Sequence, residues 1–432
     1  MKPRGEPRPY KSYPDGSHSA TFYLKRPMGQ RVTNKSTDRR ALLQTLGATG
    51  ALSALTAGAQ AAFAAPQAQA PTQEVLQPGP EVKPKHSVRF GVCGMSHDHI
   101  HGMIKAIERG GGELVAAWGA EPDKRATFTK RYPTVKMVEH QGAILDDPSL
   151  QLVLSSHIAN ERADIGVRAM KRGKDFLADK PGITTMEDLR RVRETIAETG
   201  RIYAIMYSER LEVPAAVHAG ELIKQGAIGK VIQTINIAPH QIQQGIAGGD
   251  AGGASTRPDW FWNDKQFGGI LCDIGSHQVD QFLYYTGSTS AEVVASQIAN
   301  VHHPNRPHFQ DFGDMMLRGN QGFGYVRLDW FTPDGLGTWG DGRLFILGTE
   351  GYMEARKYTN VAVSKQGNNL YVVDGKRARY IDCSHGPLPF GPQFVTDIVE
   401  RTHRAQDQEQ CLLAAELSIK AQQNATRVPL KL

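Results

Sequence analysis

Between residues 87 and 206 the sequence alternates short apolar runs with amphipathic segments. The apolar runs are strand-like, and the segments between them carry apolar residues at helical spacing. Parallel strands need such crossover segments, so the alternation predicts a parallel sheet covered by helices on both faces. The expected strands are 87–92, 113–118, 153–156, 175–178 and 201–206, and the expected helices are 100–109, 163–172 and 186–198.

The first expected strand leads through a glycine turn into a helix. Such a turn lets backbone N–H groups and the helix N-terminus approach a pyrophosphate. The dinucleotide fingerprint G-x-G-x-x-G is degraded here, because Ser96 and His99 stand where its second and third glycines belong. The cofactor-binding candidates of this region are Gly91, Gly94, Met95, Ser96 and His97.

An acidic residue follows the second expected strand. Glu121 is placed to bind the two ribose hydroxyls of NAD. Lys124 and Arg125 lie close enough to bind a 2′-phosphate instead, so NADP stays open as an alternative. Ser156, at the end of the strand expected at 153–156, is a further cofactor-binding candidate.

Two segments far apart in the sequence carry groups suited to acid–base chemistry. Lys180 falls just beyond the carboxyl end of the strand expected at 175–178, which is where ligands bind in open α/β sheets. Asp273 and His277 are four residues apart, so on a helix both face the same way. His277 is the natural general base, Lys180 lowers the pKa of a hydroxyl, and Asp273 fixes the ring or a second hydroxyl. Taken alone, these residues also fit a solvated lysine and a surface Asp–His contact.

From about residue 88 to the C-terminus the chain resembles the Gfo/Idh/MocA oxidoreductases, the group of glucose-fructose oxidoreductase and inositol dehydrogenase. The resemblance rests on Asp179-Lys180-Pro181 in place of the family's E-K-P and on the G-G-x-x-x-D-x-G-x-H segment at 268–277. Residues 226–229 match its G-A-I-G turn, and residues 348–351 match its G-T-E-G hairpin.

The resemblance implies NAD, or alternatively NADP, as cofactor and a sugar, polyol or sugar derivative as substrate. It makes Lys180 and His277 catalytic, brings Asp273 into contact with the substrate, and places Asp179 and Pro181 beside the cofactor. One departure from the family pattern lies after the strand at 153–156, where this chain has His-Ile-Ala in place of T-P-N and an arginine at 162 in place of a histidine.

Beyond residue 207 the hydrophobic period changes. A helix expected at 214–225 is followed by period-2 stretches, which predict an antiparallel sheet. The predicted fold class is therefore α/β plus α+β: a Rossmann-like doubly wound parallel sheet followed by a domain with a large, mainly antiparallel sheet. In the resembling family such a sheet often pairs subunits, so a homo-oligomer is expected. The expected strands are 231–238, 292–300, 314–317, 324–331, 343–347 and 370–373.

A substrate lying between these two domains has three candidate contacts, Arg210, His240 and Trp260. Arg210 also fits a structural ion pair, His240 a loop histidine, and Trp260 a core aromatic. The Gly-, Ala- and Gln-rich segment 241–259 fits either a mobile lid over the site or a disordered surface insertion.

The N-terminal 65 residues read as a basic head and an export signal. Asp38-Arg39-Arg40 precedes a mildly apolar stretch at 46–65 that contains A-x-A sites, a pattern similar to a twin-arginine signal. Its polar residues make a membrane anchor a poor alternative. We therefore expect recognition by the twin-arginine export machinery, cleavage, a periplasmic location and no stable membrane span in the mature form. Met28 is the expected true start.

The remaining chain divides into a Pro- and Gln-rich linker at 66–86, a dinucleotide-binding domain at 87–208 and a substrate and oligomerisation domain at 209–432.

The chain carries a net charge of +6, but residues 1–40 hold ten Lys/Arg against three Asp/Glu. The part expected to fold is thus close to neutral, which argues against nucleic-acid binding.

Export to a compartment without an NAD pool leads us to expect a tightly held, internally recycled nucleotide. One alternative in the same fold is an NAD-dependent glycoside hydrolase that oxidises its substrate transiently, and another is a nucleotide-bound protein without turnover. A metal-dependent hydrolase built on His97, His99 and His101, with His302, His303 and His308, is a weaker rival, because alternate residues on one helix cannot all face one ion. No metal is therefore expected.

The chain has four cysteines, Cys93, Cys272, Cys383 and Cys411, which are expected to be buried and to behave as small apolar residues.

Overall fold

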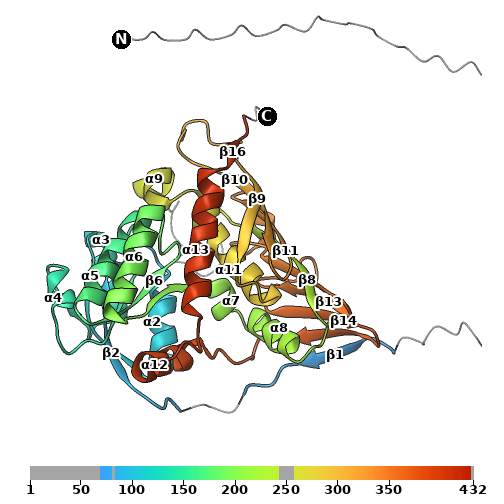
Figure 1. The fold of residues 1–432 in the computed structure, drawn as a ribbon, viewed down its shortest axis with the longest axis horizontal. Coiled ribbons are helices and arrows are strands. Elements are labelled where there is room, and N and C mark those ends of the chain that lie inside the picture. Colours follow the sequence, from blue (N-terminus) through green and yellow to red (C-terminus); the bar gives the residue numbers. More distant parts are fainter. Residues whose placement is uncertain (1–68, 80–82, 243–256, 430–432) are drawn as a thin grey trace, which may run out of the picture. The chain divides into compact units, whose positions relative to one another are not determined.

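The computed structural model describes residues 69–79, 83–242 and 257–429. The expected export signal at 1–65 lies outside these residues, and so does most of the segment 241–259. Two sheets organise the described chain, one of six strands and one of ten (Figure 1).

The six-stranded sheet is parallel throughout, with strand order β4-β3-β2-β5-β6-β7. The chain order reverses between β2 and β5, and this switch point is where open α/β sheets bind ligands. The strands are β2 (Val88–Cys93), β3 (Gly112–Trp118), β4 (Lys136–Met137), β5 (Leu152–Ser155), β6 (Asp175–Asp179) and β7 (Tyr203–Met206). Its helices are α2 (Ile100–Arg109), α3 (Pro122–Arg131), α4 (Gly142–Leu145), α5 (Arg162–Lys171) and α6 (Met186–Thr199).

Local sequence explains these elements well. Strands β5, β6 and β7 are buried at every position, as parallel strands covered on both faces must be. Helix α2 buries Ile100, Met103, Ile104 and Ile107, the i, i+3, i+4, i+7 stripe of an amphipathic helix. Helix α6 begins at the N-cap Thr185, whose side chain accepts a hydrogen bond from the Asp188 N–H.

The ten-stranded sheet follows the order β1-β15-β14-β13-β12-β8-β11-β10-β9-β16 and is mainly antiparallel. Its parallel pairs are β8 with β11, β1 with β15 and β9 with β16. The fold class predicted from the sequence is therefore confirmed. The strands are β1 (Thr72–Val75), β8 (Val231–Pro239), β9 (Ala291–Ala299), β10 (Phe312–Gly319), β11 (Phe323–Asp329), β12 (Arg343–Gly348), β13 (Gly351–Arg356), β14 (Asn369–Asp374), β15 (Ala378–Asp382) and β16 (Thr426–Arg427).

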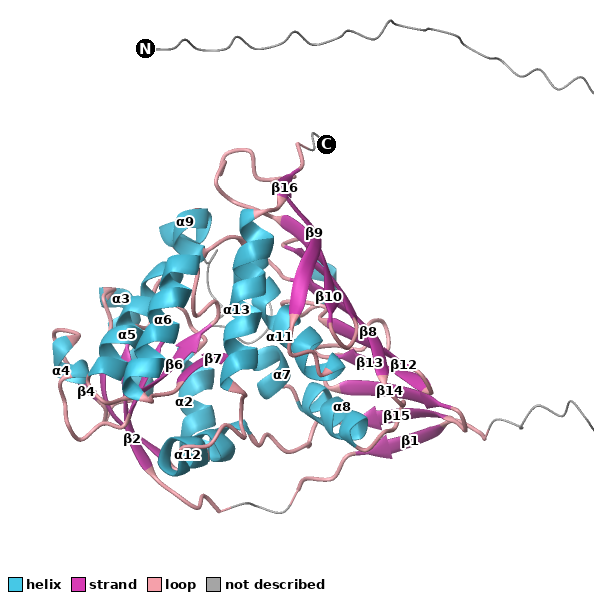
Figure 2. Cartoon of the chain, viewed as in Figure 1, coloured by secondary structure: helices cyan, strands magenta, loops and turns pink. Residues whose placement is uncertain are grey.

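Helices lie between the two sheets and carry the chain from one to the other (Figure 2). Helix α13 (Gln408–Gln423) packs against α11 (Gly275–Thr286) and α10 (Ile270–Asp273), and also against α6 and β7 of the first domain. Helix α12 (Phe390–Glu400) packs against α2. The other helices here are α7 (Ser208–Leu211), α8 (Pro214–Lys224) and α9 (Asp264–Phe267).

The C-terminal segment also completes an edge of the first sheet. The side-chain amide of Gln408 exchanges two hydrogen bonds with the backbone of Tyr203, at 2.7 and 3.1 Å, and Gln406 does the same with Ile205, at 3.1 and 3.4 Å. Both partners are on β7, whose outer edge is thereby satisfied without a further strand. The predicted boundary at 208/209 is thus incomplete, because residues 390–423 return to the first domain.

The linker expected at 66–86 was also partly wrong. Residues 72–75 form β1, which pairs in parallel with β15 at the edge of the large sheet. The segment carries no periodicity of its own to reveal this, since only the partner strand provides its hydrogen bonds.

All four cysteines are buried and free, as expected. None of the helices in the described part of the chain has the length and apolar character that a membrane crossing requires.

Replacing Gly94 with alanine should destabilise the protein by about 2 kcal/mol or more. Gly94 has φ +105°, and an added Cβ would lie 2.4 Å from Cβ of His157, so both backbone strain and a steric clash oppose a side chain. The measurement is urea unfolding of the Gly94→Ala variant. Gly102→Ala is the matched control, because Gly102 is exposed within α2, a Cβ there meets nothing within 4 Å, and alanine should stabilise the helix by about 0.5–1 kcal/mol. Equal unfolding midpoints for the two variants would contradict the strain at Gly94.

Candidate active site

A cavity of about 380 Å³ opens beyond the carboxyl end of β6, between the parallel sheet and the second domain. Its wall combines titratable groups from both domains with aromatic rings. The titratable and aromatic side chains that line it include His97, Asp98, His99, Arg162, Lys180, Glu209, His240, Arg257, Trp260, Asp273, His277, Trp330, Trp339 and Tyr358.

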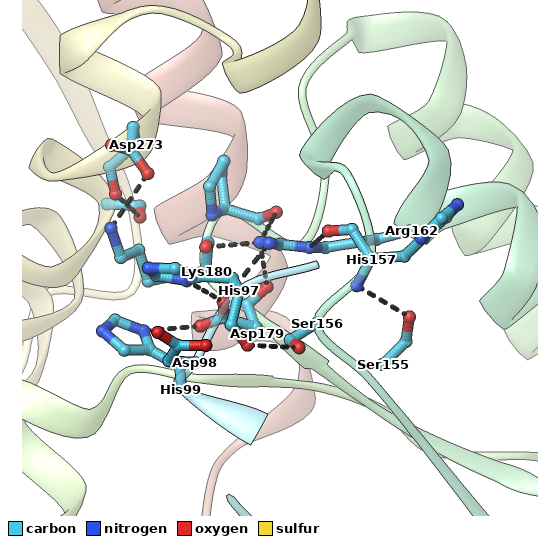
Figure 3. Close-up of polar contacts among 12 residues, drawn as sticks. His97, Asp98, His99, Ser155, Ser156, His157, Arg162, Asp179, Lys180 and Asp273 are labelled. Atoms are coloured by element: carbon cyan, nitrogen blue, oxygen red, sulfur yellow. Dashed lines mark hydrogen bonds and ion pairs between the residues drawn. The ribbon is translucent and has the colours of Figure 1, made fainter. Parts of the chain in front are cut away.

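The three residues expected to be catalytic all line this cavity. Lys180, directly after β6, donates a 2.9 Å hydrogen bond from Nζ to Oδ1 of Asp273 at the end of α10, and both side chains are largely buried (Figure 3). His277 lies in the first turn of α11 and is 2% exposed. The structure therefore brings together groups that are separated by almost a hundred residues.

His277 is held neutral. Burial lowers its pKa to about 3, with Glu209 opposing the shift and Lys180, His99 and Lys357 adding to it. Its Nδ1 is buried without a hydrogen-bond partner among the described residues. The residue lines the cavity, and a neutral imidazole can accept a proton from a ligand hydroxyl.

A buried carboxylate that the sequence analysis missed stands beside His277. Oε2 of Glu209, on α7, accepts hydrogen bonds from Lys357 Nζ at 2.6 Å and Gln278 Nε2 at 2.9 Å. Burial alone would raise the pKa of Glu209, but the Lys357 ammonium and the neighbouring histidines outweigh it and lower the pKa to about 2. Its charge favours a proton on His277. No motif pointed to Glu209, because Lys357 comes from a distant strand end.

Asp179 anchors the loops at the wall of the cavity. Nδ1 of His97 lies 2.7 Å from its Oδ2, and Nδ1 of His99 lies 3.0 Å from its Oδ1 (Figure 3). Arg162, 1% exposed, approaches the same carboxylate at 3.2 Å and donates to the backbone carbonyls of Asp179, Lys180 and Pro181. Burial opposes ionisation of Asp179, but His99, Arg162 and His97 hold its pKa well below the usual range.

The sequence predicted that His97, His99 and His101 cannot all face one metal ion, because they alternate along a helix. This prediction was wrong for His97 and His99. His97 lies in the turn before α2 and His99 is the N-cap residue, so helical spacing does not separate them. It holds for His101, whose Nδ1 lies 3.3 Å from the Tyr132 hydroxyl instead. His303 is paired with Asp311 in another part of the chain.

The residues expected to bind the adenosine ribose lie at the start of α3. Glu121, the N-cap of α3, has a buried Oε2 without a hydrogen-bond partner among the described residues, which fits a ribose diol as its ligand. Lys124 and Arg125 form solvent-exposed ion pairs with Asp98 at 2.8 Å and Glu139 at 3.2 Å, so the choice between NAD and NADP stays open.

The turn from β2 into α2 is fixed by β5 and the loop that follows it. Ser156 Oγ donates a 2.7 Å hydrogen bond to the His97 carbonyl, and Ser96 Oγ lies 3.0 Å from Nδ1 of His157. Met95 is buried against Gly119.

Gly91 has a packing role in the structure. It lies within β2, where an added Cβ would come within 2.9 Å of the side chains of Ile144 and Leu150. Its expected contact with the cofactor stays a prediction.

Two of the three expected substrate contacts line the cavity. His240 lies edge-on to Trp330 and Trp339, with ring centroids 5.3 and 4.7 Å away, and burial lowers its pKa to about 4. Trp260 follows the segment outside the described residues.

Arg210 does not line the cavity. It forms a buried two-point ion pair with Asp280, at 2.5 and 3.0 Å, and its guanidinium stacks on Tyr284. Its expected substrate contact is corrected to a structural ion pair, because Asp280, seventy residues away, already takes its charge.

Arg257 is a cavity residue that sequence reasoning did not select. It donates to the backbone carbonyls of Gln241 and Ile242, both at 3.0 Å, and stacks on Phe261 and Trp330. Among the described residues no carboxylate forms a salt bridge with it. Burial lowers its pKa to about 10. The only available signal was its place at the end of the Gly-rich segment.

The free energy of unfolding should fall as the pH drops from about 7 to 4. His240 and His277 bind protons near pH 6.5 in the unfolded chain but only near 4 and 3 in the folded protein, so acid favours the unfolded state by up to about 1 kcal/mol per pH unit for each. Urea unfolding at several pH values measures this slope. His240→Gln should flatten it, whereas the same change at the exposed His385 should not. A His240→Gln slope equal to that of the unmodified protein would contradict the assignment.

Comparison with known proteins agrees with this architecture. The family model described as "Oxidoreductase family, NAD-binding Rossmann fold" matches residues 88–207, and the "GFO/IDH/MocA C-terminal domain" model matches residues 217–354. The chain is 23% identical over 308 residues to scyllo-inositol 2-dehydrogenase (NAD(+)) of Bacillus subtilis, covering 68% of this chain and 82% of that protein. It is 25% identical over 214 residues to 1,5-anhydro-D-fructose reductase of Ensifer adhaerens, covering 48% of this chain and 59% of that protein.

Solved structures extend the comparison to the whole fold. A crystal structure of an oxidoreductase-type protein from Erwinia carotovora atroseptica SCRI1043 is 44% identical, with TM-score 0.75, over 79% of this chain and 99% of that one. Levoglucosan dehydrogenase in complex with NADH shares the fold at 16% identity, with TM-score 0.65, over 79% of this chain and 98% of that one. Together with the two domain matches, these similarities show that the chain belongs to the Gfo/Idh/MocA family of NAD(P)-dependent oxidoreductases.

Proposed function

We propose that this protein oxidises or reduces a sugar, a polyol or a sugar derivative at a CH–OH carbon. The observation that carries the proposal is the Lys180–Asp273 ion pair facing His277 in one cavity. When bound, the nicotinamide accepts or supplies the hydride. The chain's own residues handle the proton, the orientation of the substrate and the exclusion of water.

The roles of the three residues follow from their charges. The Lys180 ammonium donates to the substrate hydroxyl and favours its alkoxide form, while Asp273 holds the ammonium in place. His277, neutral at physiological pH, lines the cavity and accepts the proton on its imidazole ring. The nearby Glu209 carboxylate stabilises the imidazolium that forms.

The walls of the cavity support a polyhydroxylated ligand. Trp260, Trp330 and Trp339 offer apolar faces for C–H groups, and the charged residues between them offer hydrogen bonds for hydroxyls. Two of the curated relatives carry the names of an inositol dehydrogenase and an anhydrofructose reductase. These names favour net oxidoreduction over the glycoside-hydrolase alternative.

NAD is the proposed nucleotide, bound through Glu121.

We further propose that the protein is exported by the twin-arginine machinery to the periplasm and retains its nucleotide through successive turnovers. This part rests on residues 38–65. It is tested by N-terminal sequencing of the exported form and by mass spectrometry of the nucleotide released on denaturation. A form that remains in the cytoplasm, or one that exchanges its nucleotide freely, contradicts it.

Assembly into a homo-oligomer is proposed through the outer face of the large sheet. Exposed apolar side chains lie on three strands of this sheet: Phe323 on β11 and Met316 on the adjacent β10, 52% and 53% exposed, and Tyr352 on β13, 39% exposed. Exposed apolar side chains that gather on one surface are typical of interaction sites. Sedimentation of the purified protein tests the assembly, and a monomer at micromolar concentration overturns it.

Lys180→Ala should lower kcat by about 10²-fold or more, because the hydroxyl loses its charged partner. Nucleotide binding should persist, since Lys180 is expected to act on the substrate. Lys171→Ala is the matched control, because Lys171 is exposed at the end of α5. Thermal unfolding checks that Asp273, left without its partner, does not unfold the site, and the double variant Lys180→Met/Asp273→Asn removes that charge as well. Turnover that survives in Lys180→Ala would overturn the role.

Glu121→Ala should weaken NAD binding by about 10- to 100-fold, because a charge-assisted hydrogen bond to the ribose is lost. Binding of NADP should change less. Titration calorimetry of nucleotide-free protein measures both affinities. Glu113→Ala is the control, since Glu113 is an exposed carboxylate at the start of the preceding strand β3. An unchanged affinity for NAD would place the ribose elsewhere.

A further inference from the structure

We propose that His97, His99 and Asp179 form a binding site for one divalent transition-metal ion at the wall of the cavity. The proposal does not depend on the reaction assigned above, because ion binding can be measured without turnover. His97 and Asp179 were expected to lie beside the cofactor, but neither the sequence analysis nor the proposed mechanism gives this cluster a metal ion.

The donor atoms are arranged as ligands of one ion are. The two imidazole nitrogens face the two oxygens of one carboxylate, at 2.7 and 3.0 Å, and one donor atom from each of the three residues lies within 4.8 Å of the other two. Ligands held about 2.0–2.2 Å from an ion lie about 3 Å from each other in octahedral geometry and about 3.5 Å in tetrahedral geometry. Small movements of the two rings are thus enough to place an ion among these atoms (Figure 3).

The donor set selects the class of ion. Two imidazoles and one carboxylate bind zinc in hydrolytic enzymes and iron(II) in oxygenases, in both cases with coordination positions left open. Magnesium and calcium prefer oxygen ligands alone. We therefore expect Zn²⁺, Co²⁺ or Fe²⁺ here, rather than Mg²⁺ or Ca²⁺.

The surroundings of the three side chains hold them in place. Asp179, 1% exposed, is fixed from behind by Arg162, and the His97 carbonyl accepts the Ser156 hydroxyl at 2.7 Å. Such outer contacts orient ligands around bound metals. The Arg162 charge also opposes a cation, so the affinity should be lower than that of a structural zinc site.

The position of the cluster gives the ion access to the substrate. His97 and His99 line the same cavity as Lys180 and Asp273, whereas Asp179 lies behind them. The open coordination positions should therefore face the bound hydroxyls. A metal-bound hydroxyl loses its proton more readily, which would supplement the ammonium of Lys180.

The test uses the full-length protein without an affinity tag, stripped with a chelator and dialysed. Zn²⁺ binding is measured by calorimetry and elemental analysis, and Co²⁺ binding by its visible absorption spectrum. We expect one ion per chain, and at least a tenfold weaker affinity in His97→Ala, His99→Ala and Asp179→Asn. His101→Ala is the matched control, because His101 lies two residues beyond His99 and contacts Tyr132 instead.

Asp179 is buried, so its variant can lose ions by unfolding. His99→Ala avoids this ambiguity, because the His99 side chain is 43% exposed. Zn²⁺ should raise the Tm of the unmodified protein and of His101→Ala, but not that of His99→Ala. Absence of a stoichiometric ion, equal affinity in all variants, or loss of binding in His101→Ala overturns the proposal and leaves the cluster as a hydrogen-bonded triad. None of these outcomes depends on the catalytic role of Lys180.

Discussion

The buried carboxylate of Asp179 and the guanidinium of Arg162 fix the part of the chain on which the site depends. Arg162 donates to three successive carbonyls, those of Asp179, Lys180 and Pro181, and so holds the backbone that presents Lys180. The same carboxylate holds His97 and His99 from the turn after β2. Three loops at the edge of the parallel sheet are thus tied to one charge pair. Removing either partner would leave an uncompensated charge in the interior.

The electrostatics of the cavity follow from how its charges are paired. The buried carboxylates of Asp273 and Glu209 have lowered pKa values and keep their charges, because each has a lysine at hydrogen-bond distance. In the described part of the chain, His240 and His277 have no carboxylate at hydrogen-bond distance, so burial drives both to the neutral form. The cavity therefore presents the Lys180 ammonium together with two neutral imidazoles, a donor and acceptors that can take part in proton transfer from a hydroxyl.

Most of the first domain was readable from the sequence, although β4, α3 and α4 were not expected. Its strands and helices bury faces that repeat every two or 3.6 residues, and this pattern is local. The expected helix at 100–109 has the observed bounds of α2, and Lys180 follows β6 as expected. By contrast, β1, α12 and α13 were not foreseen, because β1 owes its hydrogen bonds to a strand about 300 residues away and the two C-terminal helices pack on elements of the first domain.

The sequence by itself determined the fold class and the family, and it pointed to Lys180, Asp273 and His277, because these features lie in local periodicity and short motifs. Only the tertiary structure decided which charges are already engaged. It paired Arg210 with Asp280, placed Glu209 with Lys357 beside His277, and set His97 and His99 on Asp179. The physical reason is range: a side-chain contact across 70 to 150 residues depends on how the elements pack, and no short stretch of sequence records it.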